Sequence, residues 1–194
     1  MSKHNDIPHR IIQEFLKLLR IHGYKGTTTR LLAEAAQVNE VTIFRHFGNK
    51  KNILTEAVKE LSYTPNLQKI VHEDIIWDLN TDLYLISKRY LDFLESIEDL
   101  VLISIREAEE FPEINQQVAE IPAEMGKLLG DYLLEMQKKR LIRSDIDTQA
   151  QAMNFILINF GYFLSNSRFG NDHLSSKEQY LTQSILLFSR GLGI

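Results

Sequence analysis

Residues 27–50 read TTTRLLAEAAQVNEVTIFRHFGNK, and this stretch decides the fold. Thr28 precedes the helix-forming run 29–36 and is a good N-cap for a first short helix, because its side chain can accept a bond from a free backbone amide. Asn39 stands in the same place before a second helix expected over residues 40–46. Two short helices with a tight connection have the geometry of a helix-turn-helix, although ordinary α-hairpins share this spacing.

Amphipathic helices flank this stretch on both sides. Before it, apolar residues recur with the i, i+3, i+4 and i+7 spacing of one helical face, which predicts a helix over residues 8–22 that stops at Gly23. These apolar residues are Ile12, Phe15, Leu16 and Leu19. After it, Asn49 is the predicted N-cap of a helix that runs through Leu61 and is interrupted or ended by the segment 63–66.

The rest of the chain is typical of longer helices, with no alternating pattern of the kind that predicts strands. We expect these helices over residues 81–96, 97–110, 112–140, 148–164 and 176–190. A break is allowed at Pro122, because proline lacks the backbone amide that a helix interior needs. The predicted fold class is therefore all-α.

Composition places the chain among soluble globular proteins. Of its 194 residues, 44% are hydrophobic and 25% are charged, which is close to the usual balance in such proteins. The absence of cysteine excludes disulfides, thiolate metal sites and cysteine nucleophiles. The N-terminal residues lack the apolar segment of a signal peptide, and no apolar run is long enough to span a membrane. We therefore expect a cytoplasmic protein.

Charge is distributed unevenly along the chain. Residues 1–51 carry nine Lys or Arg against four Asp or Glu, a net charge of +5, whereas residues 52–194 carry 13 against 22, a net charge of −9. A basic first quarter on an acidic body indicates that one end meets a polyanion while the rest is repelled from it. Chance clustering on a solvated surface is the alternative interpretation.

The stretch from Ile11 to Leu54 resembles the DNA-binding domain of TetR-family transcriptional regulators. The residues that carry the resemblance are Gly23, Tyr24, Thr27, Thr28, Leu32, Ala33, Ala36, Val38, Thr42, Ile43, Phe44, His46, Phe47 and Lys50. It implies a three-helix helix-turn-helix DNA-binding domain over residues 1–51 and a larger helical ligand-binding and dimerisation domain over residues 52–194. The function implied is that of a regulator, expected to be a repressor, which binds a palindromic operator as a homodimer and is released by a small-molecule effector.

The resemblance also implies which residues meet the DNA. Those expected on the phosphate backbone are Thr28, His46 and Lys50, and those expected near the bases are Val41, Thr42 and Arg45. Asn39 joins them because it stands at a helix N-terminus, where free amides favour a phosphate. For Arg45, a solvated surface cation is the alternative interpretation.

Three positions depart from the family pattern. Gln37 replaces the usual turn glycine, so the turn must take another conformation or accept a strained one. Val41 replaces the usual glycine early in the DNA-reading helix and adds an apolar group that could meet a thymine methyl. Phe44 replaces the usual tyrosine and lacks the hydroxyl that would donate to a phosphate.

The larger domain offers aromatic and polar side chains that could line a small-molecule pocket. The candidates are Trp77, Tyr84, Phe93, Arg106, Tyr132, Asn159 and Tyr162. A packed core contains the same kinds of residue. For Arg106 and Asn159, a structural role with satisfied hydrogen bonds is the alternative to ligand binding.

The last two predicted helices carry apolar stripes that we expect in a four-helix bundle between two copies of the chain. The residues of this expected interface are Phe155, Ile156, Phe160, Phe163, Leu181, Ile185 and Phe188. The core of an ordinary monomer is the alternative interpretation of the same pattern.

Two other classes of function compete with DNA binding. A helical-bundle enzyme with a di-metal carboxylate site would need Glu-x-x-His motifs, and no histidine of this sequence has a Glu three residues before it. No phosphate loop, dinucleotide fingerprint or nucleophile elbow occurs either, so we expect no catalysis, no metal and no cofactor. An all-helical protein-binding adaptor would share the larger domain but would not need the basic N-terminal stretch.

Overall fold

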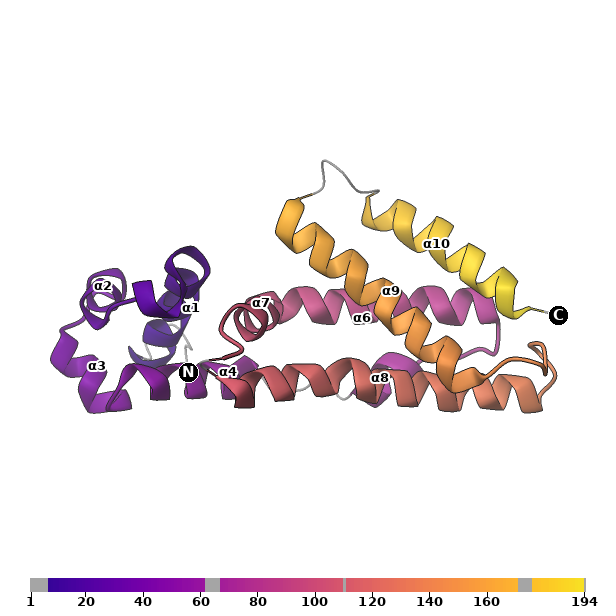
Figure 1. The fold of residues 1–194 in the computed structure, drawn as a ribbon, viewed down its shortest axis with the longest axis horizontal. Helices are drawn as coiled ribbons and strands as arrows, with labels where there is room; N and C mark the ends of the chain where they lie inside the picture. Colours follow the sequence, from indigo (N-terminus) through magenta and orange to yellow (C-terminus); the bar gives the residue numbers. More distant parts are fainter. Residues whose placement is uncertain (1–6, 62–66, 110, 171–175, 194) are drawn as a thin grey trace. The chain divides into compact units, whose positions relative to one another are not determined.

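The computed structural model describes residues 7–61, 67–109, 111–170 and 176–193, and over these ranges it contains helices and no strand (Figure 1). The all-α prediction is confirmed. The helices are α1 (Ile7–Gly26), α2 (Thr29–Ala35), α3 (Glu40–Phe47), α4 (Lys50–Leu61), α5 (Leu67–His72), α6 (Leu79–Ser96), α7 (Glu98–Arg106), α8 (Pro112–Lys138), α9 (Thr148–Phe169) and α10 (Lys177–Leu192). None of the helices described is both long and apolar enough to cross a membrane.

The chain folds into two compact units, and the first contains α1 to α4 together with residues 99–118. Within it, α1 contacts α2 and α4, and α3 contacts the same two helices (Figure 1). The side chains that fill its core are Ile11, Ile12, Phe15, Leu16, Leu19, Leu32, Ala36, Ile43, Phe47, Ile53 and Leu54. The apolar stripe predicted for the first helix is therefore buried. The functional boundary expected at residue 51 stays a prediction.

The helix α1 does not stop at Gly23, where the sequence predicted its end. Gly23 has φ 68° and ψ 176°, values outside the helical region, and the chain then continues helically to Gly26. The fully buried Thr27 donates its hydroxyl to the Gly23 carbonyl at 2.8 Å. The predicted stop signal thus produces a kink, which the side chain of Thr27 stabilises from the C-terminal side.

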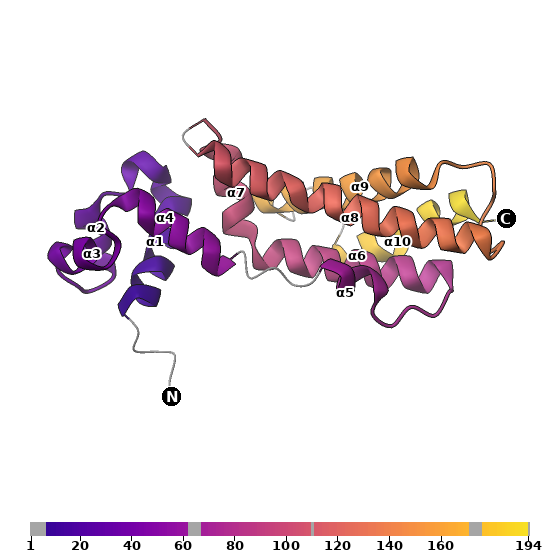
Figure 2. The same ribbon diagram turned by 90° about the horizontal axis from the view of Figure 1, so that it is seen from below.

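The second unit contains residues 65–98 and 119–194, and α6 lies at its centre. The helix α6 contacts α5, α9 and α10 (Figure 2). Its N-cap is Asp78, whose carboxylate accepts a bond from the Thr81 amide at 2.9 Å. Hydrogen bonding by the Thr81 side chain, and then by its backbone amide, lowers the pKa of Asp78. The helix α9 begins in the same way, because Asp147 accepts from the amides of Gln149 and Ala150.

Several predicted boundaries in this part of the chain were wrong. The short helix α5 falls where no helix was predicted. The helix α7 ends at Arg106 rather than near residue 110, and α9 extends to Phe169 rather than 164. The helix α8 continues through Pro122, where the sequence allowed a break but did not require one. The end of α9 coincides with Gly170, whose φ of 74° takes the chain out of the helix.

Candidate functional site

The two helices predicted from residues 27–50 are α2 and α3, and hydrogen bonds fix one against the other. Thr28 is the N-cap of α2, and its Oγ1 accepts from the Leu31 amide at 3.1 Å, as predicted. Thr29 donates its hydroxyl to the Glu40 carboxylate at 2.8 Å, which joins the first residue of α2 to the first residue of α3. Asn39 occupies the N-cap position of α3, as predicted, but its side chain makes no capping hydrogen bond.

The turn between α2 and α3 accepts a strained backbone, one of the two outcomes expected at Gln37. Gln37 has φ 52°, in the left-handed region that favours glycine. Its amide donates to the Glu34 carbonyl at 3.2 Å, and the Val38 amide donates to the Ala33 carbonyl at 3.0 Å. These two bonds form a Schellman motif, in which the left-handed residue closes the C-terminus of the helix.

The helix α3 turns one face inward and the opposite face to solvent. Ile43 and Phe47 are buried in the core of the first unit. Val41 is 74% exposed and Phe44 is 48% exposed, and Arg45 is exposed beside them. The spacing of Val41, Phe44 and Arg45 is i, i+3 and i+4, so they share one helical face. The sequence identified Phe44 as a departure from the family pattern but did not predict its exposure.

The remaining predicted DNA contacts flank this face. His46 and Asn39 are exposed, and Thr42 is half-buried. Thr28 is exposed as well, although its hydroxyl oxygen is already engaged in the cap of α2. The structure therefore leaves these side chains accessible at the ends and flanks of α2 and α3.

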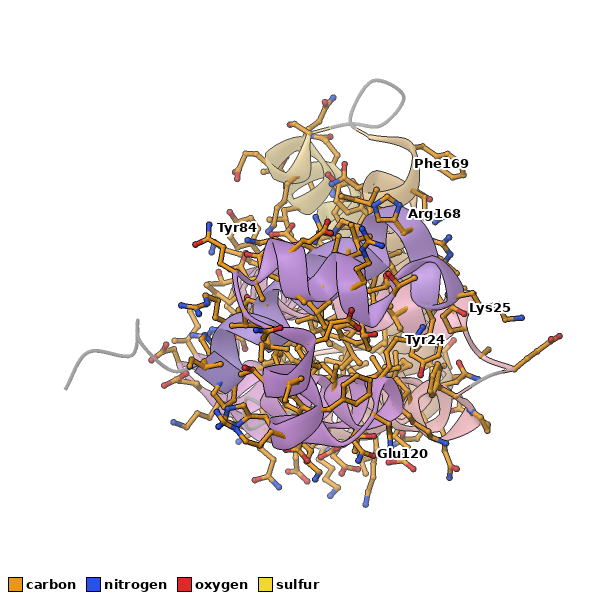
Figure 3. The ribbon with its side chains drawn as sticks, turned by 90° about the vertical axis from the view of Figure 1, so that its left-hand side faces the viewer. Tyr24, Lys25, Tyr84, Glu120, Arg168 and Phe169 are labelled. Atoms are coloured by element: carbon orange, nitrogen blue, oxygen red, sulfur yellow. The ribbon has the colours of Figure 1, made fainter. Side chains whose placement is uncertain are left out.

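Lys50 has a structural role that the sequence did not indicate. Its Nζ donates to the carbonyls of Tyr24 at 2.7 Å and Thr27 at 3.0 Å, and it lies 4.0 Å from the centroid of the Tyr24 ring. These carbonyls lie at the C-terminal end of α1, where intrahelical partners run out. Figure 3 shows Lys25 pointing outward while Tyr24 lies among other side chains. The ammonium of Lys50 thus ties α4 to the end of α1.

Arg106, Glu107 and Phe111 hold the same end of α1 from another direction within the first unit. The Tyr24 amide donates to the Glu107 carboxylate at 2.9 Å, and the Tyr24 ring meets the ring of Phe111 edge-on at 4.5 Å between centroids. The guanidinium of Arg106 lies directly against Gly23: a Cβ at Gly23 would stand 2.6 Å from its Nη2. Glycine both suits the φ of 68° here and leaves room for this contact.

The structure brings together only two of the seven predicted pocket residues. Trp77 and Tyr132 stack with their centroids 5.8 Å apart and 17° between their planes. Both line a hollow of about 390 Å³ in the second unit, and the other residues that line it are His72, Ile75, Asp131 and Glu135. The sequence analysis did not name these four residues, because none of them belongs to a pattern that indicates a pocket.

The other predicted pocket residues take structural positions. Asn159 is fully buried, accepts a bond from the Ser87 hydroxyl and donates to the Phe155 carbonyl at 2.8 Å. It therefore has the structural role that the sequence left open. Tyr162 stacks on Tyr180 with 4.0 Å between centroids. The remaining placements are Phe93 buried in the second unit, Tyr84 half-buried with its Oη 3.5 Å from Glu178, and Arg106 in the first unit.

Most of the expected interface residues are buried inside a single chain. Those that are buried are Phe155, Ile156, Phe163, Leu181 and Ile185, and those that are half-buried are Phe160 and Phe188. Side chains already enclosed in the protomer can add little area to a contact with a partner. The large apolar side chains that α9 and α10 do expose are Leu157, Ile158, Phe169 and Leu187.

Known proteins resemble most of this chain. The family model described as bacterial regulatory proteins, tetR family, matches residues 11–57. YvkB of Bacillus subtilis strain 168, described as an uncharacterized HTH-type transcriptional regulator, is 37% identical over 184 residues, which cover 94% of this chain and 95% of YvkB.

Solved structures share the fold at low sequence identity. NalD of Pseudomonas aeruginosa, described as the secondary repressor of the MexAB-OprM multidrug efflux pump, matches with a TM-score of 0.72 at 16% identity over 96% of each chain. The TetR-family transcriptional regulator PfmR of Thermus thermophilus matches with a TM-score of 0.68 at 19% identity, over 95% of this chain and all of PfmR.

Proposed function

This chain belongs to the TetR family of bacterial regulatory proteins, which are DNA-binding transcriptional regulators and not enzymes, and from that premise we propose that it is a homodimeric repressor released from its operator by a small molecule. The observation that carries the proposal is the outward face of α3. Two apolar side chains and a guanidinium stand there on one helical face, in the motif that places its second helix in the major groove.

Each side chain on this face suits a particular feature of the groove. The guanidinium of Arg45 can donate two bonds to the edge of a guanine, which is the commonest specific contact of this kind. Val41 and Phe44 have no polar atoms beyond the backbone, and they match the C5-methyl groups of thymines. We propose that α3 reads a half-site containing both features.

Phosphate contacts would hold the helix in register. The first amides of α3 have no side-chain cap, because the Asn39 side chain does not accept from them. Unpaired amides at a helix N-terminus attract a phosphate, and the exposed imidazole of His46 would add a donor at the other end of α3. A phosphate beside Lys50 would be a further acceptor for an ammonium that already donates to two carbonyls of the chain.

The homodimer is proposed on the exposed faces of α9 and α10. Leu157 and Ile158 on α9 and Leu187 on α10 are large apolar side chains in contact with solvent in the single chain. Pairing these faces with a second copy would bury them, and the resulting two-fold symmetry explains why the operator should be palindromic.

Release by an effector requires two states that differ in DNA affinity. Residues 99–118 belong to the unit that contains α2 and α3, and α8 continues from Pro112 in this unit to Lys138 in the other. We propose that a ligand bound in the second unit acts on the DNA-reading helices through this segment, whose hold on α1 depends on Glu107, Arg106 and Phe111.

The test is selection of bound duplexes from a random library, followed by titration of the enriched duplex. We expect a palindromic sequence, with an affinity that falls steeply as salt rises, because cations near phosphates release counterions. Failure to enrich any sequence would contradict the proposed role as an operator-binding repressor and favour that of a protein-binding adaptor.

A further inference from the structure

Hydrogen bonds to one buried carboxylate hold two walls of the hollow beside Trp77 in place. Asp82 is fully buried on α6, and one of its carboxylate oxygens accepts from the Ile76 amide at 3.1 Å. The other oxygen accepts from the Tyr132 hydroxyl at 2.8 Å. One carboxylate therefore positions both the segment that carries Trp77 and the tyrosine on which the indole stacks. Groups held by such bonds lose little entropy when a ligand binds.

The segment between α5 and α6 is fixed from its other end by Arg89. The guanidinium of Arg89 donates to the Glu73 carbonyl at 2.5 Å and to the Asp74 carboxylate at 2.6 Å. Asp74 has φ 57° and Trp77 has φ 62°, so two non-glycine residues of this short segment lie in the left-handed region. This conformation is uncommon for any residue with a Cβ and is an outlier for one as bulky as tryptophan.

The strain at Trp77 is not offset by burial of its ring. The residue is 40% exposed, and its ring borders the hollow of about 390 Å³. A tryptophan that served only the core would be expected to bury its large apolar surface. Backbone strain at an aromatic residue that borders a hollow is typical of ligand sites, where the surrounding structure maintains an unfavourable conformation for the sake of function.

The charges around the hollow favour a cation. Lys139 places its Nζ 4.5 Å from the centroid of the Trp77 ring, so the indole already has a positive charge over its face. Asp131 and Glu135 line the hollow. Glu135 is paired with Lys138 at 2.6 Å. Asp131 has no cationic partner among the described residues, and its carboxylate accepts a bond from the Gln149 side-chain amide at 3.5 Å.

We propose that this hollow binds an organic cation, an amine or quaternary ammonium that carries apolar groups, with its charge between the Trp77 ring and the Asp131 carboxylate. The ring supplies the electron-rich face on which such cations bind, and the carboxylate supplies the opposite charge. Lys139 occupies part of this position in the absence of a ligand and is displaced by it. The further claim that this cation is the effector rests on the proposed function.

Intrinsic fluorescence reports directly on the site, because Trp77 is the only tryptophan of the chain. The probe is choline, and the control is 3,3-dimethylbutan-1-ol, which has the same shape without the charge; both are titrated at constant ionic strength. We expect a saturable change in Trp77 emission with choline at a concentration about fivefold or more below that needed for the alcohol. Equal affinities, or no saturable change with choline, would overturn the proposal.

Variants in and just after α8 test the geometry. Lys139→Gln removes the competing ammonium and should strengthen choline binding several-fold, whereas Asp131→Asn should weaken it. Lys17→Gln is the matched control, since this exposed lysine lies on α1 in the first unit, whereas the residues that line the hollow belong to the second unit, and its loss changes the net charge equally. If Lys17→Gln strengthens binding as much as Lys139→Gln, the effect is one of overall charge, and the proposed contact is wrong.

The role as effector is tested separately on the enriched duplex. Choline at saturation should weaken duplex binding by the wild type and leave binding by Asp131→Asn much less affected. A saturable emission change without any change in duplex affinity would confirm the cation site and contradict its role as the effector site. Duplex binding with no emission change on adding choline would contradict the cation site and leave the regulator intact.

Discussion

Lys50 lies with its ammonium 2.7 Å from the Tyr24 carbonyl and 4.0 Å from the centroid of the Tyr24 ring. The sequence predicted Lys50 as a phosphate contact, but the structure shows it holding the end of α1 to the start of α4. A lysine in this position would contribute to DNA binding in two ways, because the fold that presents α3 depends on the same ammonium.

Replacing Lys50 by methionine should therefore lower stability as well as DNA affinity. Lys50→Met keeps the apolar stem but leaves two carbonyls without this donor, which should cost about 1–3 kcal/mol. Lys51→Met is the control, since the Lys51 ammonium lies 5.8 Å from the centroid of the Phe111 ring and its side chain is exposed. Chemical denaturation gives the free energy of unfolding of each variant. Equal stability of the two variants would show that the carbonyl contacts contribute nothing.

Gln37→Gly should stabilise the protein. Gln37 closes the Schellman motif of α2 with φ 52°, a conformation that glycine adopts without a steric penalty. We expect a gain of about 1 kcal/mol, or about 2–4 °C in melting temperature. Gln37→Ala is the comparison, since it shortens the side chain but retains the Cβ. If the alanine variant gains as much as the glycine variant, the backbone conformation is not the cause.

Charge at two neighbouring positions of α10 should have different effects. Leu187 is 73% exposed, so Leu187→Glu should leave the chain folded but convert the proposed dimer to a monomer. Ile185 is 3% exposed, so Ile185→Glu should unfold the second unit, because a buried unpaired carboxylate is costly. Sedimentation velocity and circular dichroism separate the two outcomes. A folded Leu187→Glu protein that remains dimeric would place the interface elsewhere.

The N-terminal helices were predictable because their signals are local. The apolar spacing from Ile12 to Leu19 and the cap at Thr28 each involve residues within two helical turns, and the structure confirms both. Even here, the kink at Gly23 could not be predicted, because its surroundings include the guanidinium of Arg106, a residue distant in sequence.

The sites of the larger domain were less predictable. An apolar pattern on a helix shows that a face is covered but not by what. The sequence therefore left open whether Phe155 and Ile185 belong to a dimer interface or to the core of one chain, and both are buried in the single chain. The aromatic pair of Trp77 and Tyr132 was named among the pocket candidates, yet the hollow is defined by charged residues such as Asp131 that no pattern distinguishes from ordinary surface.

The central claim is that α3 reads DNA bases, and the most direct measurement compares Arg45→Ala with His46→Ala on the enriched palindrome and on copies with single symmetric base changes. Both side chains are exposed on α3, so neither substitution should disturb the fold. His46→Ala should weaken binding to every duplex by one common factor, as the loss of a phosphate contact does. Arg45→Ala should instead abolish discrimination at one position of each half-site, worth about 1–3 kcal/mol, while binding to unrelated DNA falls less. A uniform loss of affinity in Arg45→Ala, with discrimination intact at every position, would contradict the account.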